Sequence, residues 1–148
     1  MKKRVLFLCT GNSARSQIAE ALLGMIAGEQ FEAQSAGTHP AGLNPVTVEA
    51  MRELGHDVRH HRSKHVQEFL GQPFDYVITV CDRAKETCPV LPGARNVCNW
   101  SFDDPSAAPP ETRLAVFRQV RDEIAERICR FLVEECRLAP SSFRCYCC

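Results

Sequence analysis

The sequence has no excess of charge of either sign and no long hydrophobic run. Its 148 residues carry 18 lysines and arginines against 18 aspartates and glutamates, which gives a formal net charge of zero. Proteins that bind nucleic acid or an anionic membrane surface usually carry a basic patch or a basic excess. We therefore expect neither partner, and we expect any anionic ligand to be held locally in a pocket.

The N-terminal region lacks the apolar length of a targeting or membrane segment. Met1-Lys2-Lys3-Arg4 resembles the basic start of a secretory signal, but the apolar run behind it is broken at Thr10. A signal needs about 7–15 apolar residues, and a membrane-spanning helix needs about 20. The nine cysteines are odd in number. In a reducing compartment cysteines serve catalysis or metal binding more often than structure. We expect a cytoplasmic protein.

Segments with strand and helix periodicity alternate along the chain. Strands are predicted at residues 4–9, 31–36, 74–81 and 95–100. Helices are predicted over residues 16–27, 45–54 and 111–136, with a short one from Ser63, as its N-cap, to Phe69. This alternation is typical of an α/β fold. We predict a single domain, residues 1–138, with an open parallel four-stranded sheet flanked by helices. Residues 139–148 form a cysteine-rich tail that we expect to be poorly ordered.

The segment Cys9–Ser16 joins the first predicted strand to the first predicted helix. It places Arg15 six residues after Cys9, across small residues. In such a loop the backbone N–H groups and the positive end of the helix converge on one point, and a guanidinium adds donors for an oxyanion. The same groups lower the pKa of a thiol, so Cys9 is expected to be a thiolate nucleophile. Ser16 is expected to donate to its sulfur.

The loop as a whole is predicted to bind the oxyanion. The residues concerned are Thr10, Gly11, Asn12, Ser13, Ala14, Arg15 and Ser16. The alternative is a structural cysteine at the end of a strand, beside a surface arginine. The strand-to-helix context and the small residues favour the catalytic interpretation.

Two further cysteines, Cys81 and Cys88, are spaced as a conditional redox pair. Cys81 ends the third predicted strand, and the carboxyl ends of parallel strands meet at one rim of the sheet, where Cys9 also lies. Cys88 follows seven residues later. If the intervening segment is helical, its ends lie about 10 Å apart, whereas a disulfide requires Cα atoms about 4.4–6.8 Å apart. The pair then closes only if the segment unwinds, which predicts a redox switch; two unconnected thiols are the alternative.

Loop residues supply the remaining candidates. Asp104, before Pro105, is a candidate general acid on the same rim, and Asp103 is the alternative. A histidine cluster consists of His56, His60, His61 and His65. The spacing of these histidines does not match a metal site, so we favour a solvated basic loop and expect no metal.

Several of these segments together resemble the thioredoxin-coupled arsenate reductases, which share the fold of the low-molecular-weight tyrosine phosphatases. The segments are Cys9–Gln17, Ser35–Thr38, Arg62–Lys64, Cys81–Pro89 and Trp100–Pro105. The resemblance, over about residues 4–135, implies that Cys9 attacks arsenate while Asp104 protonates the departing hydroxide. It further implies that Cys81 attacks Cys9 and releases arsenite, and that Cys88 then attacks Cys81. Thioredoxin reduces the resulting disulfide, so no cofactor is needed; the zero net charge and covered sheet favour a monomer.

Two features of the chain depart from this resemblance. Some relatives bind potassium through residues that match Asn12, Glu20 and Ser35, together with an acidic residue near position 64. This chain has Lys64 there, and we expect its ammonium to take the place of the cation. The tail cysteines Cys145, Cys147 and Cys148 lie outside the family pattern. Three interpretations of them are open: inert residues, a metal-binding segment or an extra thiol pair.

Two other functions are weighed against the reductase. A phosphotyrosine phosphatase would need only Cys9, Arg15 and Asp104, and phosphate is nearly isosteric with arsenate. Phosphatases of this fold tend to carry a tyrosine beside the Asp-Pro pair, which this chain lacks. A metal- or arsenic-binding module built from Cys and His would retain binding after Cys9→Ser. We favour the reductase over both.

Overall fold

A four-stranded parallel sheet forms the centre of the protein, as the sequence predicts. The computed structural model describes residues 1–81 and 93–145. The strands are β1 (Lys3–Cys9), β2 (Phe31–Gly37), β3 (Phe74–Thr79) and β4 (Ala94–Asn99), in the order β2-β1-β3-β4. β1 pairs with β2 on one side and β3 on the other. A strand in this interior position is buried on both faces, which explains its continuous apolar sequence.

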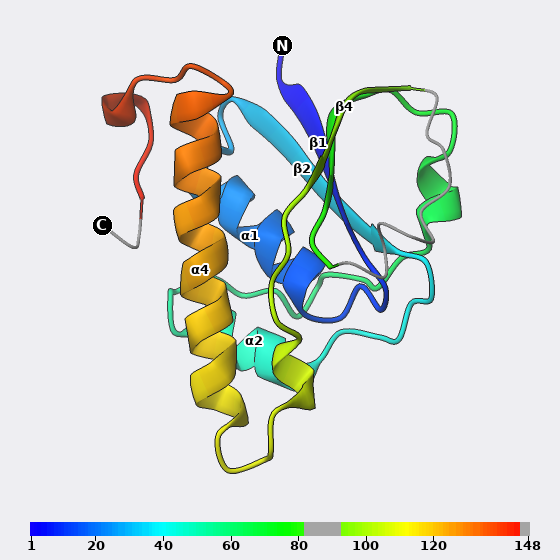
Figure 1. Cartoon of the computed structure of the whole chain (residues 1–148), viewed down its shortest axis with the longest axis vertical. Helices are drawn as coiled ribbons and strands as arrows, with labels where there is room; N and C mark the ends of the chain where they lie inside the picture. Colours follow the sequence, from blue (N-terminus) through cyan, green and yellow to red (C-terminus); the bar gives the residue numbers. More distant parts are fainter. Residues whose placement is uncertain (82–92, 146–148) are drawn as a thin grey trace.

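In the described part of the chain, three α-helices pack on one face of the sheet. They are α1 (Arg15–Ala27), α2 (Pro45–Arg52) and α4 (Arg113–Glu134). Figure 1 shows α4 running along one side of the molecule, with α1 beside it. The larger apolar core lies here, and it contains Val5 and Phe7 of β1. The alternate residues Leu6 and Leu8 enter a smaller core on the opposite face, under the 3-10 helix Val66–Phe69.

Local capping signals predict the start of α2 but not that of the 3-10 helix Val66–Phe69. The Asn44 side chain accepts a hydrogen bond from the Val46 N–H at 2.9 Å, so α2 begins as predicted. The predicted N-cap at Ser63 is wrong. His65 caps the short 3-10 helix, and the Ser63 hydroxyl donates instead to the Gly11 carbonyl at 3.1 Å. The Ser63 hydroxyl, which the local pattern predicted as a helix cap, therefore bonds instead to a residue far away in the sequence.

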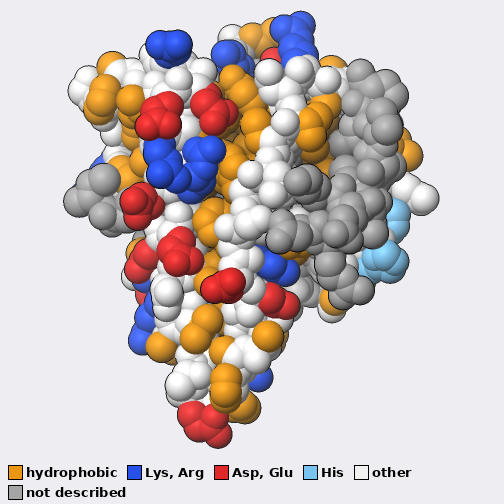
Figure 2. Space-filling view, viewed as in Figure 1, with side chains coloured by type: hydrophobic (Ala, Val, Ile, Leu, Met, Phe, Trp, Pro, Cys, Tyr) orange, Lys and Arg blue, Asp and Glu red, His pale blue; other side chains and the backbone are white. Residues whose placement is uncertain are grey.

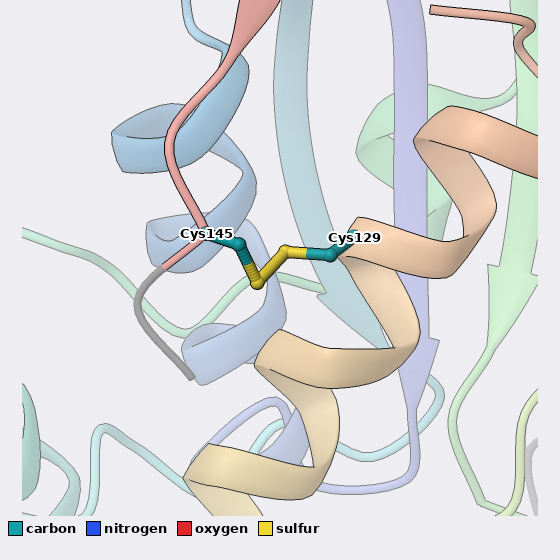
Figure 3. Close-up of a disulfide and its surroundings, with 2 residues drawn as sticks. All are labelled: Cys129 and Cys145. Carbon is teal, nitrogen blue, oxygen red and sulfur yellow. A yellow bond between two sulfur atoms is a disulfide. The ribbon is translucent and has the colours of Figure 1, made fainter. Parts of the chain in front are cut away.

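The C-terminal segment is bound covalently to α4. A disulfide joins Cys129 of α4 to Cys145, with the Cα atoms 6.1 Å apart (Figure 3). The Gln30 amide also donates to the Ser142 carbonyl at 3.2 Å. Cys145 thus belongs to a thiol pair, but its partner lies in α4, which the sequence did not indicate. Cys147 and Cys148 lie outside the described residues. Within the described ranges, no helix has both the length and the apolar character to cross a membrane.

Candidate active site

Three carbonyl groups of the Cys9–Ser16 loop bond to the segment that follows β2. The carbonyls of Thr10, Gly11 and Ser13 accept hydrogen bonds of 2.8–3.1 Å from backbone N–H groups of residues 39–44. The Gly11 N–H bonds to the Cys9 sulfur, and a loop before a helix start can present such N–H groups to an anion. Asn12 adopts a left-handed conformation (φ 47°) that turns the loop, and asparagine tolerates this region better than most residues.

The end of β2 touches this loop directly. A Cβ atom on Gly37 would lie 2.5 Å from the Thr10 carbonyl oxygen and 3.0 Å from the Asn12 backbone nitrogen. Both neighbours are backbone atoms, so neither can move aside without moving the loop. Glycine at position 37 is therefore required for the loop to close on the sheet.

A cavity of about 190 Å³ lies inside the loop. It is lined by Cys9, Thr10, Gly11, Ser13, Ala14, Arg15, Asp104 and Ser106. The structure thus brings the predicted nucleophile, the predicted arginine and the predicted general acid together. Asp103 is not among the residues that line this cavity.

The environment of Cys9 contains opposing effects on its pKa. A side-chain contact with Cys81, followed by burial, raises the pKa of the Cys9 thiol well above its usual value. The Arg15 charge and a hydrogen bond from the Gly11 N–H act in the opposite direction. The pKa of Cys9 is therefore shifted in the direction opposite to the one predicted from the loop and Arg15 alone, because Cys81, which the sequence places at the same rim, contacts the Cys9 sulfur.

The Arg15 side chain is fixed in position, but its guanidinium is only partly hydrogen-bonded. Its side chain is largely buried, Nη1 donates to the Phe102 carbonyl at 3.0 Å, and Nη2 lies 3.9 Å from Asp104 Oδ2. Nε is buried and has no hydrogen-bond partner among the described residues. A buried N–H without a partner costs about 1–3 kcal/mol. This orphan donor beside the cavity is what an oxyanion ligand would satisfy.

Asp104 is oriented by its neighbours. Its Oδ1 accepts from the backbone N–H and the hydroxyl of Ser106, at 3.0 and 2.6 Å. Oδ2 is the oxygen nearer to Arg15. The carboxyl therefore presents one oxygen to the cavity, as the predicted general acid requires.

The side chain of Asn12 organises the loop from behind. It is fully buried, and its Nδ2 donates to the hydroxyls of Ser16 and Ser35, each at 2.9 Å. Its Oδ1 accepts from the Lys64 backbone N–H at 2.8 Å. The predicted bond from Ser16 to the Cys9 sulfur is not found among the described contacts, because the Ser16 hydroxyl faces Asn12 instead.

This network continues to a buried ion pair. The Ser35 hydroxyl donates to Glu20 Oε1 at 2.8 Å, and Lys64 Nζ lies 3.6 Å from the same oxygen. The Lys64 ammonium thus stands beside residues that the family resemblance associates with a cation. That it replaces such a cation stays a prediction. In the described part of the chain no group of His, Cys, Asp or Glu could hold a metal ion.

His61 belongs to the same network, which corrects the prediction of a solvated loop. Its Nδ1 lies 3.1 Å from Glu20 Oε2 and 3.2 Å from the Gln17 amide oxygen. Both neighbours are acceptors, so Nδ1 carries the hydrogen. Burial, partly opposed by the Glu20 charge, lowers the pKa of His61. A signal in the sequence indicates these partners of His61. Gln17 and Glu20 are polar residues on one turn of a helix that is mostly apolar and buried.

Of the two further cysteines predicted to take part in redox chemistry, Cys81 is described by the structure and Cys88 is not. Cys81 is buried next to Cys9, and its sulfur lies 3.6 Å from the Thr10 hydroxyl. Cys88 and most of the predicted redox segment lie outside the described residues. The described arrangement is therefore an oxyanion cavity with a buried nucleophile and a second thiol in contact with it.

Comparisons with known proteins agree with this geometry. The pattern of the low molecular weight phosphotyrosine protein phosphatases matches residues 4–139. The chain belongs to this family. A relative in it, an arsenate reductase of Halalkalibacterium halodurans, is 43% identical over 132 residues, which are 88% of this chain and 95% of the relative.

Solved structures of this family are similar to the chain over most of its length. An arsenate reductase in its phosphate-binding state has a TM-score of 0.73 at 27% identity, covering 89% of this chain and 98% of that one. A thioredoxin-dependent arsenate reductase of Corynebacterium glutamicum has a TM-score of 0.68 at 28% identity, covering 89% of this chain and 63% of that one. The family fold, an α/β sheet with the loop at its rim, is thus shared.

Proposed function

We propose that the protein reduces arsenate to arsenite through a relay of three cysteines, with thioredoxin as the source of electrons. The observation that carries the proposal is the contact of a second thiol, Cys81, with the sulfur of Cys9 at an oxyanion cavity. A hydrolase needs only one nucleophilic thiol at such a cavity. A reductase of this kind also needs a second thiol that forms a disulfide with the first. The names of the relatives, arsenate reductases, support the same conclusion.

The first step is attack by Cys9 on arsenic. The loop N–H groups and the free Arg15 Nε bind the oxygens of arsenate, which neutralises charge on the oxyanion. The Cys9 proton passes to a basic oxygen of arsenate, and the thiolate forms a sulfur–arsenic bond. One As–OH bond breaks, and Asp104 donates a proton to the departing hydroxide, which leaves as water.

The second step transfers two electrons to arsenic. Cys81, as a thiolate, attacks the sulfur of Cys9 and forms a Cys9–Cys81 disulfide. The electron pair of the sulfur–arsenic bond stays on arsenic, which leaves as arsenite in the trivalent state. The two thiols lose the two electrons that arsenic gains and are thereby oxidised to the disulfide. Contact between the two side chains brings the attacking sulfur close to its target.

The third step returns Cys9 to the thiol form. Cys88 attacks Cys81, forming a Cys81–Cys88 disulfide, and the dithiol of thioredoxin reduces that disulfide by the same exchange chemistry. The spacing of the two cysteines in the sequence supports this step, and so does the thioredoxin dependence of a structural relative. We further propose that the protein works as a monomer in the cytoplasm, where thioredoxin is kept reduced.

The test is arsenate-dependent NADPH oxidation with thioredoxin and thioredoxin reductase. The wild type should turn over, and Cys9→Ser, Cys81→Ser and Cys88→Ser should each lose activity. Cys136→Ser, which changes a half-buried thiol outside the cavity, is the matched control and should retain activity. Turnover that survives Cys81→Ser would contradict the relay.

A phosphatase activity is the second candidate, and the anion cavity itself favours it. Hydrolysis of an aryl phosphate would need Cys9, Arg15 and Asp104 but not Cys81. If the wild type hydrolyses p-nitrophenyl phosphate, fails to reduce arsenate, and Cys81→Ser leaves hydrolysis unchanged, the protein is a phosphatase rather than a reductase.

A further inference from the structure

A second cavity lies between α4 and the segment that follows β4. Its volume is about 400 Å³. It is lined by Asn99, Trp100, Ser101, Phe102, Glu123, Glu126, Arg127 and Arg130. Figure 2 shows acidic and basic side chains intermixed along α4 on the face in view. The reaction proposed above uses none of these side chains.

Two residues that line this cavity each carry a buried N–H donor without an acceptor among the described residues. Trp100 is only 4% exposed, and its indole Nε1 makes no hydrogen bond with any described residue. Arg127 Nη1 is also buried and makes no hydrogen bond with any described residue, although the Arg127 side chain as a whole is partly exposed. The Arg127 guanidinium lies over the Trp100 ring, with its carbon 4.5 Å from the ring centre. Two unpaired donors on stacked groups cost free energy unless an acceptor reaches both. The same signature marks Arg15 in the oxyanion cavity.

The charges around the cavity restrict the class of that acceptor. Its lining holds two arginines and two glutamates, Arg127, Arg130, Glu123 and Glu126. Arg127 Nη2 is additionally 3.4 Å from Glu135. The lining is therefore close to neutral, so a dianion such as phosphate would meet two carboxylates without a surplus of positive charge. A monoanion with two acceptor oxygens fits the two donors, and a planar carboxylate is the common partner of a guanidinium.

We propose that this cavity binds a small carboxylate molecule, whose oxygens accept from Trp100 Nε1 and Arg127 Nη1. The proposal does not depend on the reaction proposed above. It does place the ligand near the catalytic arginine, because Phe102 lines the cavity and its carbonyl accepts from Arg15 at 3.0 Å. A volume of about 400 Å³ falls within the usual range for small-molecule sites.

The chain offers a direct probe, since it contains one tryptophan. Its indole N–H gives one resonance in a ¹H–¹⁵N spectrum, which can be followed while sodium acetate is added to the full-length protein. Sodium chloride at equal ionic strength is the control titration. We expect acetate to move the indole proton resonance downfield with saturation, as a new hydrogen bond forms, and chloride to leave it in place.

Variants separate this site from other effects of acetate. Arg127→Met keeps an apolar chain over the indole but removes the donor, and should weaken the acetate response about tenfold or more. Arg127→Lys, a milder change, should weaken it because the planar pair of donors is lost. Arg118→Met, on α4 outside the cavity, should respond as the wild type. The proposal is overturned if the wild-type resonance does not respond to acetate, which would leave water as the acceptor. It is also overturned if Arg127→Lys responds fully, because acetate would then act elsewhere, for instance in the oxyanion loop.

Discussion

At the scale of single residues, the sulfur of Cys9 is subject to opposing influences. The contact with Cys81 is the largest of the effects that raise its pKa, and Arg15 with the Gly11 N–H opposes it. In the proposed relay, the group that must later attack Cys9 is thus also the group that favours its protonated form beforehand.

Replacing Cys81 should therefore make Cys9 more acidic. Cys81→Ala removes the largest cause that raises the pKa of Cys9, so alkylation of Cys9 by iodoacetamide should begin at lower pH than in the wild type. The rate can be followed across pH by mass spectrometry of the Cys9 peptide. Cys98→Ala is the control and should leave the profile unchanged. An unchanged or raised midpoint in Cys81→Ala would contradict this account.

The two neighbouring aspartates can be separated by matched substitutions. Asp104 lies 3.9 Å from Arg15 and lines the oxyanion cavity, whereas Asp103 does not line it. Loss of a general acid typically costs about 10²–10⁴-fold in rate. Asp104→Asn should lower kcat for arsenate reduction by about 10²-fold or more. Asp103→Asn should stay within a few-fold of the wild type; an equal loss in both variants would remove the distinction.

At the scale of elements, the oxyanion loop depends on its contact with the end of β2. A Cβ on Gly37 would come within 2.5 Å of the Thr10 carbonyl oxygen. A displacement of about 1 Å at a catalytic site can cost about 10²-fold in rate. Gly37→Ala should therefore reduce kcat by about that factor and lower the melting temperature.

The matched control for this substitution lies in α1. Apart from the neighbouring residues and the backbone of its own helix, no atom lies within 4 Å of the position that a Cβ on Gly24 would take. Gly24→Ala should keep full activity and should stabilise the helix by about 0.5–1 kcal/mol. If Gly37→Ala were as active as Gly24→Ala, the close approach of β2 to the loop would not matter for catalysis.

The packing of the histidine segment against α1 predicts a pH dependence of stability. Burial lowers the pKa of His61 below the value of about 6.5 that it has in the unfolded chain. The folded state then binds fewer protons than the unfolded state. The stabilisation from neutral His61 is therefore complete above pH 6.5 and is lost as the pH falls toward its folded-state pKa.

Urea denaturation between pH 7.5 and 5.5 measures this effect. The free energy of unfolding of the wild type should decrease over that interval, and His61→Gln should show a smaller decrease. The free energy of unfolding of His61→Gln should still depend on pH to some extent, because burial also lowers the pKa of His56. His39→Gln, at an exposed position, should keep the slope of the wild type. A full slope in His61→Gln would exclude His61 as a source.

At the scale of the whole molecule, the disulfide between Cys129 and Cys145 fixes the C-terminal segment on α4. The two cysteines are 16 residues apart, and closing a loop of about this length stabilises the folded state by about 3 kcal/mol through the unfolded chain. Cys145→Ser should lower the free energy of unfolding by up to about that amount without a reductant. With dithiothreitol, variant and wild type should coincide; a difference that persists there would mean that the disulfide is not the cause.

The fold could be predicted closely because its signals are local. The apolar run of β1, the Asn44 cap and the amphipathic pattern of α4 are each contained in a short window, and the structure reproduces them. Errors arose where a side chain had a choice of partners. Ser63 and Ser16 were given nearby partners, but one bonds to the Gly11 carbonyl and the other to Asn12.

The sequence by itself determined the sheet, the oxyanion loop and the set of residues around it. The presence of the strands and the chemistry of the loop follow from periodicity and from the types of residues at close spacing, whereas the spatial order of the strands came from the structure. Only the tertiary structure decided that Cys81 raises the pKa of Cys9 and that His61 meets Glu20, whereas Lys64 was already expected beside Glu20 from the family resemblance. It also decided that Cys145 reaches Cys129. These pairings join residues far apart in sequence, and such contacts form only when packing of the whole core brings their elements together.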